Sequence, residues 1–239
     1  EWFSTNDLNH PGIKSLIKRG KYFISGKISR PQYNNFTFQK FEVTPKKSKE
    51  LIYIKGWNTV VGFHTRNIPH QGHIFIQKKS IKYANADGLM LSPAVGVKKK
   101  GDFKNEMLIE SYSEVLRSKT HYNKAILCCL DIYSRYAGAR EAVFTAICRK
   151  NLGCSHFIVG RDHTGFNNNS TDKDIRRFFS EIGDFGIKII FFDTLGFNSR
   201  TKRYTFTQNT KNIISGSTVR SLIKQKKKIP NYLLDKYQQ

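Results

Sequence analysis

Long apolar runs are missing from the 239 residues of this sequence. A membrane-spanning helix needs roughly 20 consecutive, mostly apolar residues, and no stretch of the chain approaches that length. No secretory signal peptide is visible either. We therefore expect a cytoplasmic protein that has no membrane partner.

Cysteine is scarce as well. The four cysteines are Cys128, Cys129, Cys148 and Cys154, and they form neither a CxxC pair nor the spacing of a zinc finger. Reduced thiols are the simplest interpretation in a cytoplasmic protein. Cys128 and Cys129 fall in an expected strand and would belong to the core. No zinc site is expected from these residues.

Acidic residues are few: 18 Asp and Glu stand against 41 Lys and Arg, which gives a net charge of +23 at pH 7. A field of that sign favours nucleic acid, an acidic membrane, or small phosphate and sulfate compounds as partners. The densest basic runs, residues 98–100 and 224–228, are not interleaved with the aromatic side chains on which bases stack. No motif resembles a nucleic-acid-binding module, so nucleic acid is not expected and small anions are favoured.

Apolar segments alternate with helical patterns from residue 59 onward, which predicts an α/β fold. Such strands read as buried on both faces, as in a parallel sheet covered by helices on each side. Before residue 50 the chain is irregular, apart from a short helix expected at 10–20 and some strand-like alternation after it. The predicted strands are 59–63, 88–93, 124–130, 156–160 and 187–193; the predicted helices are 73–85, 104–118, 140–151, 172–182 and 217–228.

Polar loops follow four of these strands. They read HTRNIPHQGH, SPAVGVKKKGD, DIYSRYAG and GRDHTG, and all are rich in Gly, Arg, His or Asp. Ligands bind at the carboxyl ends of the strands in open parallel sheets. The four loops therefore predict one binding site at that edge.

The first of these loops places His70 and His73 in the first turn of an expected helix. Free backbone N–H groups and the helix dipole favour an anion there, and residues three apart share a helix face. Gly72 would let a phosphate approach the backbone. Two ordinary surface histidines are the alternative, and a zinc pair is disfavoured because such pairs usually lie four residues apart.

Three further motifs each have a plain structural alternative. In GRDHTG, Arg161 can grip a phosphate and His163 can donate to an oxyanion, whereas the alternative is a turn capped by Asp162. In RYAGAREA the glycine can admit a base or ribose, or the segment simply opens a helix. In ISGSTVR the hydroxyls can cap a helix, and with Arg220 they can also hold terminal phosphates.

These motifs together resemble the sulfate adenylyltransferase (ATP sulfurylase) family. TRNIPHQGH resembles the family's TRNP-x-H-x-x-H signature, RYAGAREAVFTAICRKNLGCSHFIVGRDHTG its RYAGPREA…GRDHAG block, and ISGSTVR its ISGTxxR motif. The resemblance extends in order from about His10 to Arg220. It implies a Rossmann-like parallel sheet of the HxGH nucleotidyltransferase type, with helices on both faces. By the same resemblance, residues 1–50 are the linker and remnant of an N-terminal, β-rich PUA-like domain, and 51–239 are the catalytic domain.

The resemblance implies transfer of AMP from ATP to sulfate, giving adenylyl sulfate and pyrophosphate, with Mg²⁺ accompanying the nucleotide. Positioning and charge neutralisation dominate such a step. The resemblance assigns Thr65, Arg66 and Asn67 to the active site, and it assigns to His70 and His73 the stabilisation of the α-phosphate in the transition state. Nucleotide binding is assigned to Gly160, Arg161, Asp162, His163, Leu195, Ser217 and Arg220.

The chain departs from the family pattern at two positions that contact the acceptor anion in the family. His64 stands where the family has Gln and Thr164 where it has Ala, and both positions, with Arg66, are those that contact sulfate in the family. A different acceptor anion, such as a phosphonate or phosphate ester, or a different NTP, therefore stays open, and the imidazole of His64 could add positive charge for a dianion. Pro69 also comes one place later than in the signature. A non-catalytic, basic nucleic-acid-binding module is the remaining alternative, and a homo-oligomer is left open.

Overall fold

A computed structural model describes most of the chain, in the segments 2–27, 29, 41, 43–98, 101–118, 122–160, 172–207 and 213–234. No helix in these segments is both long enough and apolar enough to cross a membrane.

A five-stranded sheet forms the centre of the molecule, and all its neighbouring strands are parallel. Its strand order is β3-β2-β1-β4-β5, so β1 is central and the chain reverses direction of winding beside it. The α/β fold predicted from the alternating pattern, and the Rossmann-like sheet that the family resemblance implies, are thereby confirmed. The strands are β1 Val60–Thr65, β2 Gly88–Pro93, β3 Ala125–Leu127, β4 His156–Val159 and β5 Lys188–Phe191.

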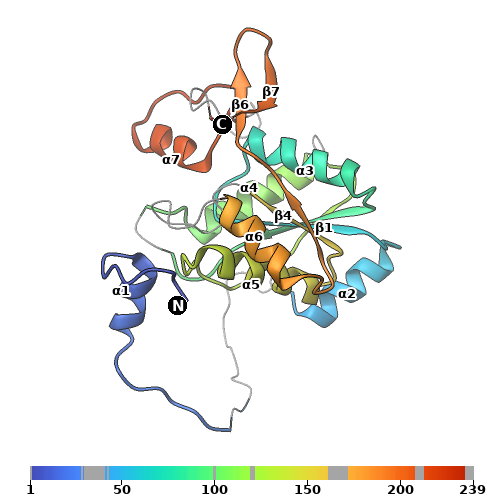
Figure 1. The fold of residues 1–239 in the computed structure, drawn as a ribbon. Helices are drawn as coiled ribbons and strands as arrows, with labels where there is room; N and C mark the ends of the chain where they lie inside the picture. Colours follow the sequence, from blue (N-terminus) through green and yellow to red (C-terminus); the bar gives the residue numbers. More distant parts are fainter. Residues whose placement is uncertain are drawn as a thin grey trace.

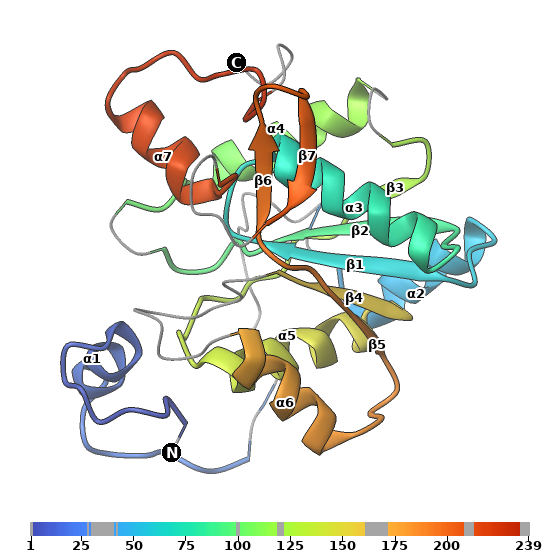
Figure 2. The same ribbon diagram turned by 45° about the horizontal axis from the view of Figure 1, so that its top comes forward.

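Helices cover both faces of this sheet, as the first two views show (Figures 1 and 2). On one face lie α3 (Gln71–Tyr83) and α4 (Asn105–Arg117), and on the other α5 (Gly138–Asn151) and α6 (Asp172–Ile182). Successive strand residues alternate between two cores, since side chains of a strand point to opposite faces. Val61 packs with Tyr112 of α4, whereas its neighbour Val60 packs with Ala146 of α5.

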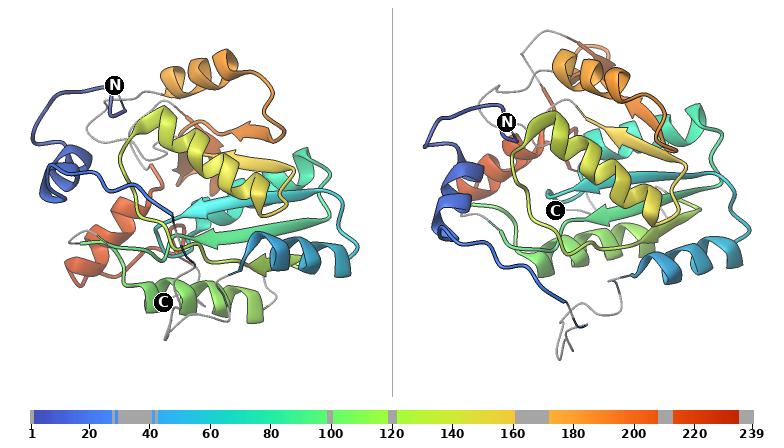
Figure 3. Two further views of the ribbon diagram at one scale, coloured as in Figure 1. Left: turned by 90° about the horizontal axis from the view of Figure 1, so that it is seen from below. Right: turned by 60° about the horizontal axis from the view of Figure 1, so that its bottom comes forward.

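Two helices lie beyond the carboxyl ends of the central strands, α1 (Pro11–Lys18) and α7 (Gly216–Lys224) (Figure 3). The short helix expected at 10–20 corresponds to α1, and Gly20 follows it with a φ of 95°. A smaller apolar cluster, which includes Val219 of α7, holds α7 against the end of the sheet.

Helix α2 (Pro45–Ile54) was not predicted. Its start has an ordinary signal, because Thr44 caps the Lys47 N–H and Pro45 occupies the first helical position. Ile52 buries this helix in the same core as α5 and α6. The boundary predicted between residues 50 and 51 falls inside α2, and the division into domains stays a prediction.

An antiparallel hairpin of β6 (Leu195–Asn198) and β7 (Arg203–Phe206) was also missed. Its turn is closed by the Asn198 side chain, whose Oδ1 accepts from the Arg200 and Thr201 N–H groups. Residues of β7 are largely exposed, so the segment lacks the apolar run that marks the other strands. The third strand is shorter than predicted, and α7 ends four residues before the expected 228.

Candidate functional site

A cavity of about 270 Å³ opens at the carboxyl ends of β1, β4 and β5, between the first turns of α3 and α7. Every described residue that the sequence assigned to the site lines it. These residues are His64, Thr65, Arg66, Asn67, His70, His73, Gly160, Leu195, Ser217 and Arg220. The remaining four, Arg161, Asp162, His163 and Thr164, lie outside the described residues.

His70 forms the N-cap of α3 with its ring rather than with a hydroxyl. Its Nδ1 accepts the backbone N–H of His73 at 3.3 Å, as a capping oxygen usually does. The proton of the neutral ring therefore resides on Nε2. Nε2 is buried and has no hydrogen-bond partner among the described residues, so a residue that lines the cavity retains an unused N–H donor.

Burial also decides the charge of this histidine. The side chain is almost fully inaccessible, and desolvation lowers the pKa of His70 to about 3. Desolvation, and then the proximity of His70, lowers the pKa of His73 as well. The two rings are stacked with centroids 3.6 Å apart. At neutral pH both act as uncharged hydrogen-bonding groups rather than as cations.

Tyr112 fixes the second ring from behind. The Tyr112 hydroxyl lies 3.3 Å from His73 Nδ1 and 3.3 Å from the Asn67 carbonyl oxygen, and Phe63 meets the ring of His73 edge to face. Tyr112 belongs to the buried stripe of α4, where nothing in the sequence separates it from a core aromatic residue.

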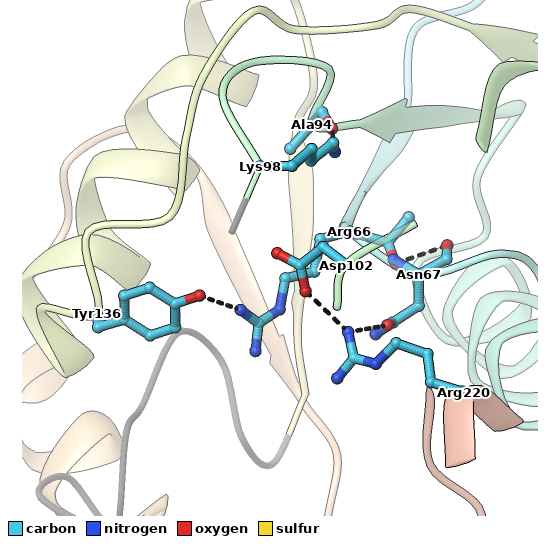
Figure 4. Close-up of polar contacts among 8 residues, drawn as sticks. Arg66, Asn67, Ala94, Lys98, Asp102, Tyr136 and Arg220 are labelled. Atoms are coloured by element: carbon cyan, nitrogen blue, oxygen red, sulfur yellow. Dashed lines mark hydrogen bonds and ion pairs between the residues drawn. The ribbon is translucent and has the colours of Figure 1, made fainter. Parts of the chain in front are cut away.

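A tight turn after β1 presents the cation and the amide. Thr65 Oγ1 accepts the Asn67 N–H at 3.0 Å, so this hydroxyl shapes the turn. Arg66 Nη1 donates to the Tyr136 hydroxyl at 2.8 Å (Figure 4). Tyr136 itself has a positive φ of 61°, and it was not assigned to the site from the sequence.

Helix α7 reaches the same turn through Arg220. Its Nη1 donates to Asn67 Oδ1 at 2.9 Å and to Asp102 Oδ1 at 3.1 Å (Figure 4). Desolvation, and next the nearby Arg66, lowers the pKa of Arg220, whereas Asp102 raises it. Asp102, whose side chain is almost buried, forms an ion pair with Arg220.

The start of α7 contributes hydroxyls. Ser215 caps the helix by accepting the Thr218 N–H at 3.2 Å, and Ser215 Oγ lies 2.7 Å from Ser217 Oγ. This capping is the structural alternative weighed for ISGSTVR. The cap leaves the backbone of the first turn at the wall of the cavity, where Gly216 lines it. The capping is thus observed, and the binding of terminal phosphates by this motif stays a prediction.

His64 at the end of β1 has a partner that the sequence did not indicate. Arg149 of α5 donates from Nη2 to His64 Nδ1 at 2.6 Å. A guanidinium is a donor only, so Nδ1 of His64 must be unprotonated. His64 is therefore a neutral group in this arrangement, which corrects the expectation that its imidazole adds a charge.

No metal site is evident in the described segments, where no cluster of three or more His, Cys, Asp or Glu side chains is suited to a metal ion. The cysteines that are buried, Cys128, Cys129 and Cys154, belong to the core, as expected for the first two.

Fold and cavity together define the class of this chain: a Rossmann-like α/β domain with a cavity of imidazole, guanidinium and amide groups at the carboxyl edge of its sheet. The profile of the ATP-sulfurylase family matches residues 39–236. The chain belongs to this family.

Its relatives support that membership. The chain is 36% identical over 238 residues to a sulfate adenylyltransferase of Pyrococcus abyssi and 35% identical over 238 residues to one of Ignicoccus hospitalis. Each alignment covers 97% of this chain and 62% of the relative, so the chain spans less than two thirds of those proteins. A solved structure described as a hexameric APS kinase from Thiobacillus denitrificans has the same fold, with a TM-score of 0.65 at 20% identity over 86% of this chain and 40% of that one.

Proposed function

We propose that this chain transfers AMP from ATP to sulfate, giving adenylyl sulfate and pyrophosphate. The observation that carries the proposal is the convergence of the family's motif residues on one cavity, where a buried His70 Nε2–H has no partner. Membership in the ATP-sulfurylase family supports the same activity.

The reaction needs no covalent intermediate on the protein. A sulfate oxygen attacks the α-phosphorus, the bond from that phosphorus to the bridging oxygen of pyrophosphate breaks, and pyrophosphate leaves with the electron pair. No proton has to move. The chain has to align three anionic groups and neutralise their charge, which is positioning and electrostatic work.

The described residues can divide that work. His70 Nε2–H would donate to an α-phosphate oxygen, and its hydrogen bond would strengthen as charge develops there. His73, held by Tyr112, would assist from the same helix turn. The cations Arg66 and Arg220 would neutralise oxyanions, and Asn67, fixed by Arg220, would donate its amide.

Nucleotide binding extends the proposal to residues around the rim. Leu195 would pack near the base, and Gly160 leaves open space beside the backbone, which favours close approach of the nucleotide. Ser217 would serve the terminal phosphates at the start of α7. Arg161, Asp162 and His163 keep the nucleotide-binding roles, and Thr164 the acceptor role, that the resemblance assigns. Mg²⁺ would arrive with the triphosphate and offset the charge of the leaving pyrophosphate.

The test is pyrophosphate release from ATP with and without sulfate in the presence of Mg²⁺. Release that depends on both substrates is expected. Release that ignores sulfate but responds to a phosphonate or a phosphate ester would move the proposal to another acceptor. Nucleic-acid binding that weakens steeply with salt, without any turnover, would contradict it.

A further inference from the structure

Arg149 is a fully buried guanidinium in the last turn of α5, behind the cavity wall formed by the end of β1. It donates to three acceptors: His64 Nδ1 at 2.6 Å, the Ser92 carbonyl at 3.2 Å and the Thr145 carbonyl at 3.4 Å. Its Nε is buried and has no partner among the described residues. This cation takes no part in the site predicted from the sequence.

Within the described segments, no carboxylate forms an ion pair with Arg149. The uncharged His64 ring is its nearest ionisable neighbour, at 2.6 Å, and the other ionisable groups that act on its charge are thiols. Burial raises the pKa of both Cys128 and Cys154 to about 12, so these thiols are neutral at physiological pH. Desolvation lowers the pKa of Arg149 only to about 10, and it remains a cation.

A buried charge without a counter-ion is costly. The protein keeps space for it nonetheless: a Cβ on Gly62 would lie 2.9 Å from Arg149 Cγ, so the central strand has a glycine where the guanidinium stem passes. From its buried position the cation reaches the cavity through one group, the His64 ring, which lines the cavity beside Arg66.

We propose that Arg149 is a positioning and charge-supplying residue of the acceptor-anion site. It holds His64 as a neutral donor, with the proton on Nε2, and its uncompensated charge favours a dianionic acceptor over a monoanion of the same shape. The inference rests on the proposed function, because it takes the wall at His64 and Arg66 as the acceptor site.

The two contributions of Arg149 can be separated by substitution. Arg149→Lys keeps the charge, Arg149→Gln keeps a donor for His64 without the charge, and Arg149→Met removes both. A group that only positions His64 would make the lysine and glutamine variants alike. A group that supplies charge makes the glutamine variant resemble the methionine variant.

The experiment measures the dissociation constants of sulfate and of perchlorate, which share a tetrahedral shape and differ in charge. Coulomb energy scales with ligand charge. Removing the charge should therefore cost the monoanion perchlorate half the binding energy that it costs the dianion sulfate. If sulfate affinity falls about tenfold, perchlorate affinity should fall only about threefold, the square root of that factor. We expect the ratio of the two constants to shift in Arg149→Gln and Arg149→Met and to stay near the wild-type value in Arg149→Lys.

The thermal unfolding midpoint of each variant is measured as a check that the variant folds. If Arg149→Met does not fold, Arg149→Gln is the variant that tests the loss of charge. Equal loss for both anions, or an unchanged sulfate constant, would overturn the inference while sulfate-dependent pyrophosphate release still upheld the proposed function. The converse result is distinct: an Arg149-dependent ratio without pyrophosphate release would support the anion site and contradict the activity. A wild-type chain that binds neither anion would overturn both.

Discussion

At the residue scale, His70 performs two tasks with the two nitrogens of one ring. Nδ1 caps α3, and Nε2 carries a proton that no described residue accepts. The cap fixes the tautomer, so the local structure of the helix start prepares the group for its proposed chemical role.

Substitution can separate these tasks. Asparagine is a good N-cap but cannot place a donor where Nε2 lies. We expect His70→Asn to keep the stability of the protein within about 0.5 kcal/mol and to lower kcat by roughly 100-fold or more, with nucleotide affinity within tenfold. His70→Ala should lose about 1 kcal/mol of stability in addition.

Steady-state kinetics and denaturant unfolding of the two variants check this prediction. If His70→Asn retained wild-type kcat, the Nε2–H would have no place in the transition state. A parallel loss of nucleotide affinity and kcat would instead indicate a role in ground-state binding.

The depressed pKa of His70 has a consequence for stability. The unfolded ring binds a proton below its ordinary pKa of about 6.5, whereas the folded ring does so only below about 3. Because the unfolded state then binds more protons, stability is complete above pH 6.5 and falls as the pH falls towards 3. The His70 ring alone should lower the free energy of unfolding by up to about 2 kcal/mol between pH 7 and pH 5.

Urea unfolding at pH 7, 6 and 5 measures that slope. The slope reports how many more protons the unfolded state binds than the folded state. In His70→Asn this number should fall by close to one, since asparagine does not titrate. An identical pH dependence in the variant and the wild-type protein would show that the ring is not desolvated as the structure indicates.

At the scale of elements, α7 must approach the turn after β1 closely. A Cβ on Gly216 would lie 2.4 Å from Asn67 Cγ, so only glycine permits this contact without movement. Gly216→Ala should displace Asn67 and its partner Arg220 and lower kcat/KM by about tenfold or more. Gly26→Ala is the matched control, because open space surrounds that glycine, and its kinetics should match the wild-type protein.

Asp102 links the loop after β2 to α7 through Arg220. Asp102→Asn keeps the size of the side chain and removes its charge, which leaves Arg220 without its carboxylate partner. We expect a loss of about 1–2 kcal/mol in unfolding free energy, less than for a fully buried pair because Arg220 is partly exposed.

The control for Asp102 is an exposed pair on α4, Glu114 with Arg117. Glu114→Gln should change the unfolding free energy by less than about 0.5 kcal/mol. Equal effects of the two substitutions would show that the Asp102 contact contributes no more than a surface ion pair.

At the scale of the whole molecule, the net charge of +23 creates a positive field around the chain. Such a field speeds the encounter with an anionic ligand and is screened by salt. Raising NaCl from about 50 to about 500 mM shortens the Debye length several-fold and should raise the KM for ATP several-fold, with kcat little changed. Steady-state kinetics at constant Mg²⁺ test this prediction. A KM for ATP that does not change with salt would show that the long-range field of the chain does not contribute to ATP binding.

Most of the architecture was predictable because it depends on local periodicity. The five parallel strands and the helices between them follow from apolar runs and from the 3.6-residue pattern, which act over a few residues. Helix α2 was missed although Thr44 and Pro45 mark its start, and the β6–β7 hairpin was missed because half-exposed strands lack an apolar run.

The sequence by itself determined which chemical groups are present and which strand ends carry them, since parallel strands bring their carboxyl ends to one edge. Only the tertiary structure decided how those groups are used. Arg149 contacts His64 from 85 positions away, and Arg220 contacts Asn67 from 153. Such contacts depend on how α5 and α7 pack against the sheet. Burial exists only in the folded chain, where it sets the charge of His70 and encloses Arg149 without a carboxylate partner among the described residues.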